Sequence, residues 1–273
     1  MTAFDINSQQ REALCDLGGK ACKEIKDIAP NQDVLITMLP SGQQLLEIYA
    51  EHGPLLNHLK PSCLLIDCST VGTIAAQHWH GIVNKKGYRS VDAPVSGGVV
   101  AAKNQSLTFM MGGSSNDISD AQQILSHIGK QFIHTGHKSS GQTAKICNNL
   151  ILANNMIALS EAFILAKKLG LQQEKFLEVV QKSSGNSWVV EKYLPIANLM
   201  ENVPANNHYQ PGFSTQMMAK DLNLVKECCE QLNLELKVTH TSQTLYDDML
   251  KDKLGDKDFS YVYAYIQAIN DQD

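Results

Sequence analysis

The sequence lacks the features that mark several large classes of protein. It has no block of basic residues, and its 28 acidic residues outnumber its 23 lysines and arginines, which gives a net charge of −5. Because phosphate backbones attract basic surfaces, we expect no nucleic acid as a partner. No run of about 18 apolar residues is free of polar interruption, so we expect no membrane partner either.

The cysteines and the first residues both argue against secretion. The seven cysteines form no C-x-x-C pair and no disulfide framework, and their number is odd, which favours a reducing compartment. The first ten residues show neither the order of a signal peptide nor the arginine bias of a transit peptide. We therefore expect the bacterial cytoplasm or, in a eukaryote, the mitochondrial matrix.

Two sequence patterns suggest a metal or a nucleotide, and each falls short. His78 and His80 have no cysteine or acidic cluster beside them, and Trp79 between them favours an ordinary helix surface, so no metal is expected. The stretch 136–143 resembles a phosphate-binding loop, but Gln142 stands where such a loop has its lysine. Nucleotide hydrolysis is therefore disfavoured.

What is present in the first half is an alternation of short apolar strands and helices. The strands are predicted at 2–6, 34–39, 64–68, 88–93, 107–111 and 131–134, and the helices at 8–17, 43–51, 74–84 and 118–128. Ser69-Thr70 is predicted to cap the third of these helices. Strands that alternate with helices indicate an α/β protein with a parallel, doubly wound sheet, which binds ligands at the carboxyl ends of its strands.

From Gly141 onward the strand signal stops, and residues 141–273 are predicted to form an all-helical domain after an α/β domain of residues 1–140. A helix from Thr143 to Leu169 contains no glycine or proline, and its middle is apolar nearly all round, so we expect it to be buried on most sides. Lys145, Asn148 and Asn149 share one face of its first turns. Either Lys145 is solvated at a frayed helix end, or it is a buried amine with a function.

Three further motifs each have a functional and an ordinary interpretation. Ser96-Gly97-Gly98, after the strand that ends near Asp92, could bind an anion through backbone N–H groups or could be a simple turn. Asp5 follows a strand, where it could accept a hydrogen bond from a ribose or serve a turn. Lys220-Asp221 could be a solvated ion pair or could cover a ligand.

Together these motifs resemble the β-hydroxyacid dehydrogenase family over essentially the whole chain. The residues that carry the resemblance are Met38-Leu-Pro40, Asp67-Cys-Ser-Thr70, Asp92-Ala-Pro-Val-Ser-Gly-Gly98, Gly141-Gln-x-x-Lys145-x-x-Asn-Asn149 and Phe213 with Lys220-Asp221. The segments 183–188, 203–207 and 258–260 are most similar to the branch that oxidises 3-hydroxyisobutyrate in valine breakdown.

The resemblance implies NAD as cofactor and a role for each motif. Lys145 is the implied acid/base at the substrate hydroxyl, Asn149 orients that hydroxyl or the lysine, and Ser96, Gly97 and Gly98 hold the substrate carboxylate. The implied cofactor contacts are Asp5, Leu39, Pro40, Gln44, Thr70, Phe213, Lys220 and Asp221. Asp5 would favour NAD over NADP, because a carboxylate repels a 2′-phosphate. A homodimer or homotetramer is also expected, because the long apolar helix exceeds the needs of one small domain.

The sequence departs from the family in one important respect. It contains no GxGxxG turn, and it starts at what corresponds to the family's second strand. We therefore expect an N-terminally truncated Rossmann-like sheet without its pyrophosphate-binding turn, and weakened NAD binding. Two alternatives stay open: a catalytically impaired protein that acts through oligomerisation, and a sister reductase for tartronate semialdehyde or a similar short hydroxy acid.

Overall fold

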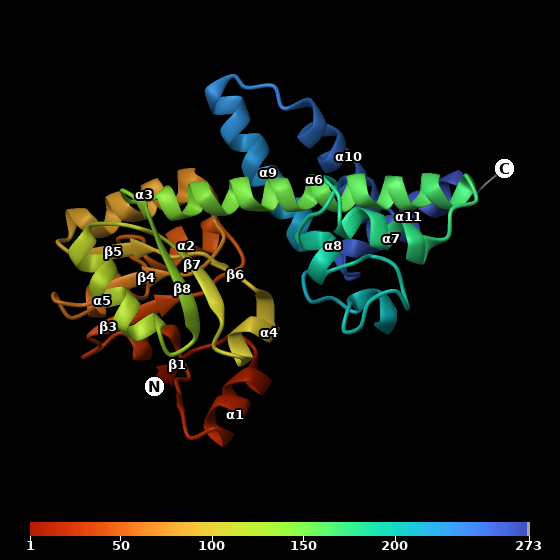
Figure 1. Cartoon of the computed structure of the whole chain (residues 1–273). Helices are drawn as coiled ribbons and strands as arrows, with labels where there is room; N and C mark the ends of the chain where they lie inside the picture. Colours follow the sequence, from red (N-terminus) through yellow and green to blue (C-terminus); the bar gives the residue numbers. More distant parts are fainter. Residues whose placement is uncertain (272–273) are drawn as a thin grey trace. The chain divides into compact units, whose positions relative to one another are not determined.

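The computed structural model describes residues 1–271, which divide into two compact units, Met1–Lys145 and the residues from Ile146 onward. Unit 1 is an α/β domain and unit 2 is entirely helical (Figure 1). The α/β fold class followed by a helical half is therefore confirmed. The sequence placed the boundary near residue 140, where helix α6 (Ser140–Lys168) begins, and the two units divide a few residues into that helix.

Unit 1 contains a six-stranded sheet. Its strands are β3 (Val34–Thr37), β4 (Leu64–Asp67), β5 (Arg89–Asp92), β6 (Val95–Ser96), β7 (Leu107–Gly112) and β8 (Gly129–Gly136). The order is β3-β4-β5-β7-β6, with β8 also paired to β7. The register aligns Thr37 with Asp67 and Asp67 with Asp92, so β3, β4 and β5 end at one edge of the sheet.

The sheet is not wholly parallel, which refines the prediction from sequence. β3, β4 and β5 run parallel, whereas β7 runs antiparallel to β5 and β8 follows β7 in parallel. The reversal arises because β6 pairs antiparallel with β7 and the helix between them, α4 (Gly98–Lys103), has only six residues. A parallel connection needs a longer crossover that can return over a face of the sheet.

Apolar side chains fill both faces of this sheet, as the uninterrupted apolar strands predict. Helices α2 (Gly42–Ile48) and α3 (Gly72–Lys85) cover one face, where Leu35 and Leu65 pack with Leu45 and Trp79. Helix α5 (Ser115–Leu125) covers the other face. Val71, rather than Ser69-Thr70, occupies the N-cap position of α3, and the Ser69 hydroxyl donates to Asp67.

The first residues form a separate pair of strands. β1 (Thr2–Ala3) and β2 (Lys20–Ala21) run parallel in a two-stranded sheet, and α1 (Ser8–Asp16) between them buries none of its residues. Figure 1 shows α1 standing apart from the six-stranded sheet. Within residues 1–271, no strand pairs with the outer edge of β3, where Ile36 is 40% exposed.

Unit 2 has one apolar core built from six helices. They are the larger part of α6, then α7 (Gln173–Gln181), α8 (Trp188–Lys192), α9 (Thr215–Leu232), α10 (Lys237–Lys251) and α11 (Val262–Asn270). Short 3-10 turns at Pro204–Asn207 and Phe259–Tyr261 connect them; two others, Ile25–Ile28 and Leu56–His58, lie in unit 1. Phe163 and Met156 of α6 are fully buried in this core.

Helix α6 is less buried than its sequence predicts. Ile151 and Leu165 are 57% and 60% exposed, so the helix carries an open apolar stripe. By length and composition alone α6 could also cross a membrane, but half of its most apolar window is buried, as in the core helix of a globular domain.

Candidate active site

Three of the cofactor residues that the sequence predicts in unit 1 lie at the carboxyl edge of β3, β4 and β5. Leu39 and Pro40 follow β3, and Thr70 follows β4. The two loops are joined, since the Leu39 N–H donates to the Ser69 hydroxyl over 2.7 Å. Gln44 lies on the exposed face of α2, where its side chain accepts a hydrogen bond from Ser41.

A buried carboxylate, Asp67, stands at the end of β4. One of its oxygens accepts hydrogen bonds from the Thr37 and Ser69 hydroxyls, each over 2.7 Å. The other oxygen has no hydrogen-bond partner in the described part of the chain. Burial of the charged form raises the pKa of Asp67 to about 6.

The Ser96 turn also leaves this sheet, after β5. Ser96 lies in β6 opposite Thr108, and Gly97 and Gly98 follow with φ angles of 125° and 65°. A residue other than glycine is strained at such angles, and a Cβ on Gly97 would meet Ala101 at 2.4 Å. Both glycines are exposed, and their predicted contact with a substrate carboxylate stays a prediction.

Asp92, which is fully buried, fixes the start of α6 at the same edge. Its carboxylate accepts hydrogen bonds from the Ser139 N–H over 2.7 Å and from the Gln142 N–H over 3.0 Å. A carboxylate is favourable there because a helix N-terminus presents unpaired N–H groups and a positive partial charge. A Cβ on Gly141 would meet the Met110 carbonyl oxygen at 2.3 Å, so only glycine allows this close approach.

His80 is the third partner of Asp92, which corrects its interpretation as part of an ordinary helix surface. His80 is 3% exposed, its Nε2 lies 3.0 Å from Asp92, and its Nδ1 lies 2.8 Å from the Ser90 hydroxyl. Neighbouring Trp79 is also buried, because α3 turns this side toward the sheet. No group of metal ligands is found among the residues that the structure describes.

Lys145, on the second turn of α6, is only 8% exposed. This excludes the interpretation of Lys145 as a solvated lysine at a frayed helix end. Asn149 follows one helical turn later on the same helix and is also buried.

In unit 2, Asn149 belongs to a polar group with α9. Its side-chain amide donates to Asp221 over 2.5 Å, and the other oxygen of Asp221 lies 3.1 Å from the Lys220 amine. Asp221 is 1% exposed, so this ion pair is not the solvated pair that was the ordinary interpretation. Phe213 lies just before α9, in a turn whose N–H groups donate to the buried Asp258.

Asp5 makes a hydrogen bond that stabilises the turn before α1. Its carboxylate accepts a hydrogen bond from the Asn7 N–H over 2.7 Å, at the start of α1, and it is exposed. This is the turn-forming contact that an aspartate commonly makes after a strand. Its predicted contact with a ribose stays a prediction.

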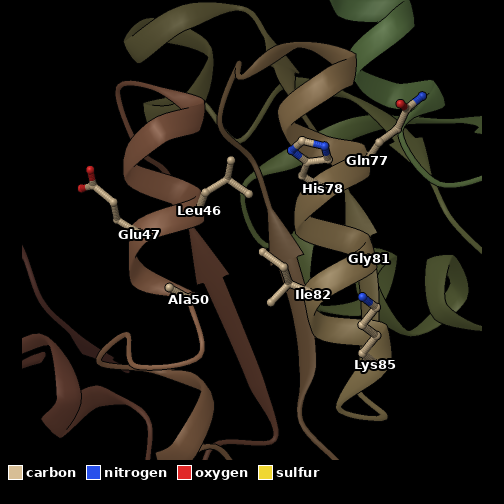
Figure 2. A pocket seen from close by; sticks show the side chains of 8 residues that line it. All are labelled: Leu46, Glu47, Ala50, Gln77, His78, Gly81, Ile82 and Lys85. Atoms are coloured by element: carbon tan, nitrogen blue, oxygen red, sulfur yellow. The ribbon is translucent and has the colours of Figure 1, made fainter.

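A surface hollow between α2 and α3 is separate from all these residues. Figure 2 shows Leu46 and Ile82 pointing into the space between the two helices, with His78 and Lys85 along α3. None of its eight lining residues is a predicted site residue.

Sequence reasoning missed the residues that position the start of α6. Asp92 and Gln142 were noted only as members of sequence motifs, and neither was assigned a partner or a role. The available signal was the spacing of Gln142 and Lys145, since residues three apart share one face of a helix.

Comparison with known proteins gives a family match for each half of the chain. Residues 1–136 match the model of the NAD binding domain of 6-phosphogluconate dehydrogenase, and residues 139–266 match the model described as NAD-binding of NADP-dependent 3-hydroxyisobutyrate dehydrogenase. An α/β half that matches the first model, followed by a helical half that matches the second, defines an NAD-dependent dehydrogenase.

The chain's relatives define the family more closely. The mitochondrial 3-hydroxyisobutyrate dehydrogenase of Rattus norvegicus is 37% identical over 93% of this chain and 79% of its own length. The NAD-dependent L-serine dehydrogenase of Pseudomonas aeruginosa is 35% identical over 96% and 88%. A structure of Mycobacterium tuberculosis 3-hydroxyisobutyrate dehydrogenase with L-serine superposes with a TM-score of 0.91 at 33% identity, covering 97% of this chain and 89% of that one. The chain belongs to the β-hydroxyacid dehydrogenase family.

Proposed function

We propose that the chain oxidises 3-hydroxyisobutyrate to methylmalonate semialdehyde, as in valine breakdown. The observation that carries this proposal is the burial of Lys145, on a helix whose first turn is fixed by Asp92 to the edge where β3, β4 and β5 end. The printed names of the rat and M. tuberculosis relatives support this substrate.

In this proposal each residue performs one step of the binding or the proton transfer. Lys145 accepts the proton of the 3-hydroxyl, and Asn149, held by Asp221, orients the hydroxyl or the amine. Ser96, Gly97 and Gly98 bind the substrate carboxylate through hydroxyl and backbone N–H groups. Bound NAD supplies the hydride acceptor.

The residues present fit the nicotinamide end of the cofactor better than its pyrophosphate. The joined loops after β3 and β4 supply Leu39, Pro40 and Thr70, and we assign Asp5, Gln44, Phe213, Lys220 and Asp221 as further cofactor contacts. Residues 1–271 contain no GxGxxG turn. We therefore expect weak binding in calorimetry with NAD, and a micromolar Kd would contradict this expectation.

L-Serine is a second candidate substrate, because a P. aeruginosa relative is named for it and the M. tuberculosis structure contains it. Both candidates are 3-hydroxy acids that differ at the neighbouring carbon, and a reductase for tartronate semialdehyde is a third possibility. A panel of three alcohols, 3-hydroxyisobutyrate, L-serine and glycerate (the reduced form of tartronate semialdehyde), assayed with NAD and followed by NADH absorbance, tests the proposal. We expect the highest kcat/KM with 3-hydroxyisobutyrate, and a higher value for either other compound would contradict it.

The open stripe of α6 supports self-association. Ile151 and Leu165 are 14 residues apart, close to four helical turns, so they lie on the same side of the helix. We propose that this side pairs with a second copy, giving a homodimer or homotetramer. Light scattering tests this: Ile151→Ser with Leu165→Ser should reduce the molar mass. An active wild-type chain would at the same time exclude a protein that acts through oligomerisation alone.

For location we propose the bacterial cytoplasm or the mitochondrial matrix, consistent with the mitochondrial name of the rat relative.

A further inference from the structure

The side chain of Gln142 is fully buried and makes three hydrogen bonds to one loop. Its carbonyl oxygen accepts from the Val71 N–H over 3.0 Å and from the Gly72 N–H over 3.2 Å. Its amide nitrogen donates to the Ser69 carbonyl oxygen over 2.7 Å. One planar group therefore satisfies two donors and one acceptor of the backbone between β4 and α3.

These bonds satisfy backbone N–H groups at the start of α3 with a side chain from another helix. Val71 occupies the N-cap position, where its side chain makes no capping hydrogen bond, and Gly72 has a φ of 77°. The first N–H groups of a helix have no partner within the helix. Gln142 supplies an acceptor to two N–H groups at this start, so the loop's conformation depends on a residue that is 70 positions away.

The backbone of Gln142 is fixed as firmly as its side chain. Its N–H donates to Asp92, which is also bonded to Ser139 and His80. Lys145 follows three residues later, on the same face of the same helix. The loop that carries Thr70 and the turn that carries Lys145 are thus joined through one residue.

We propose that Gln142 is a positioning residue for the dehydrogenase reaction. Its carboxamide fixes the position of the Ser69–Gly72 loop relative to the first turns of α6. The loop carries Thr70, a proposed cofactor contact, and the helix carries Lys145, the proposed acid/base. The inference rests on the function proposed above for Lys145 and Thr70. A small displacement of reacting groups is costly, since a misplacement of about 1 Å can lower a rate by about 100-fold.

The chemistry of the carboxamide makes the proposal testable with two substitutions. Leucine at this position keeps most of the volume but offers no hydrogen bond. An ionised glutamate offers two acceptors and no donor, so it would face the Ser69 carbonyl oxygen with like polarity. A protonated glutamate again has one acceptor oxygen and one donor, as the amide does.

The experiment compares Gln142→Leu and Gln142→Glu with matched changes at Gln123, an exposed glutamine on α5. We expect kcat with 3-hydroxyisobutyrate and NAD to fall about 10- to 100-fold in Gln142→Leu, with the folded state retained in circular dichroism. In Gln142→Glu, kcat relative to the wild type should recover as the pH is lowered and the introduced carboxyl is protonated. Gln123→Leu and Gln123→Glu should match the wild type throughout.

A second measurement needs neither cofactor nor substrate. Hydrogen exchange of the free protein should show protected Val71 and Gly72 amides in the wild type and in Gln123→Leu. In Gln142→Leu these two amides should exchange about 10-fold faster or more, because their acceptor is gone. In Gln142→Glu protection should persist, because both forms of the carboxyl can accept these bonds.

Each outcome decides the inference. Unchanged exchange at Val71 and Gly72 in Gln142→Leu would show that Gln142 does not hold the Ser69–Gly72 loop. An unchanged kcat in an active enzyme would show that the hydrogen bonds of Gln142 to this loop do not affect the reaction. A pH-independent defect in Gln142→Glu would also contradict the proposal. If the wild type reduces no NAD with any substrate of the panel, the proposed function fails as well, whereas failure at Gln142 in an active enzyme leaves that function intact.

Discussion

The edge of unit 1 where α6 begins and the core of unit 2 through which α6 continues are held by different forces. At the edge, buried polar groups make directed hydrogen bonds: Asp92 and Gln142 together take part in six of them. In the core, Phe163, Met156 and Ala153 are fully buried among apolar neighbours. Hydrogen bonds specify position at modest net gain, whereas apolar burial stabilises without specifying direction. Hydrogen bonds therefore fix the position of the N-terminal end of α6, whereas apolar burial stabilises the rest of the helix.

The largest effect on stability is expected in the apolar core. Phe163→Ala leaves a cavity beside Phe176, whose ring centroid lies 4.8 Å away, and should lower the free energy of unfolding by about 4 kcal/mol. Urea unfolding measures this change, with Val179→Ala at an exposed position of α7 as the control, expected within about 0.5 kcal/mol of wild type. Equal losses in the two variants would show that the core does not anchor α6.

A smaller loss is expected where the polar edge is tightest. Gly141→Ala places a Cβ against the Met110 carbonyl oxygen and the Asp92 carboxylate, and should cost about 3 kcal/mol. The control is Gly81→Ala in α3, where a Cβ would meet nothing within 4 Å. That change should be neutral or stabilise by up to about 1 kcal/mol, because alanine is the better helix former. A tolerated alanine at 141 would contradict the close approach of α6 to β7.

The third effect depends on pH. The pKa of Asp67 is raised to about 6 in the folded protein from an ordinary value near 3.8, so the folded state binds the proton more tightly. The stability that protonation provides is fully present below about pH 4 and is lost as the pH rises through 6. Asp67→Asn removes the buried charge and should raise the free energy of unfolding at pH 8 by roughly 2 kcal/mol, with the gain vanishing toward pH 4.

Urea unfolding from pH 4 to pH 8 measures the difference between Asp67→Asn and wild type. Asp16→Asn, on the exposed α1, is the control and should show no comparable pH-dependent gain. A gain of equal size at pH 4 and pH 8 would mean that Asp67 is not a buried, charged group at neutral pH.

The sequence predicts the apolar parts of this molecule better than its polar edge. Uninterrupted runs such as Leu64–Ile66 identify buried strands, because strand burial depends on residues that are adjacent in the chain. The partners of Asp92 and Gln142 are 12 to 73 positions away, and no local pattern encodes such distances. Lys145 was found by resemblance and by its unusual place in an apolar helix, whereas His80 was misjudged because its burial depends on which side α3 turns to the sheet.

The antiparallel direction of β7 relative to β5 was not predicted, for a related reason. Val95-Ser96 is too short to be recognised as a strand, yet its pairing with β7 decides the direction of the next two strands. The exposed stripe of Ile151 and Leu165 was also missed, because composition alone does not show whether an apolar helix is covered by its own chain or by a second copy.

The most direct test of the account is the turnover of Lys145→Ala. We predict that kcat with 3-hydroxyisobutyrate falls by about 1,000-fold, while the melting temperature and the NAD affinity measured by calorimetry stay close to those of the wild type. A folded Lys145→Ala enzyme that turns over at the wild-type rate would contradict the assignment of Lys145 as the acid/base.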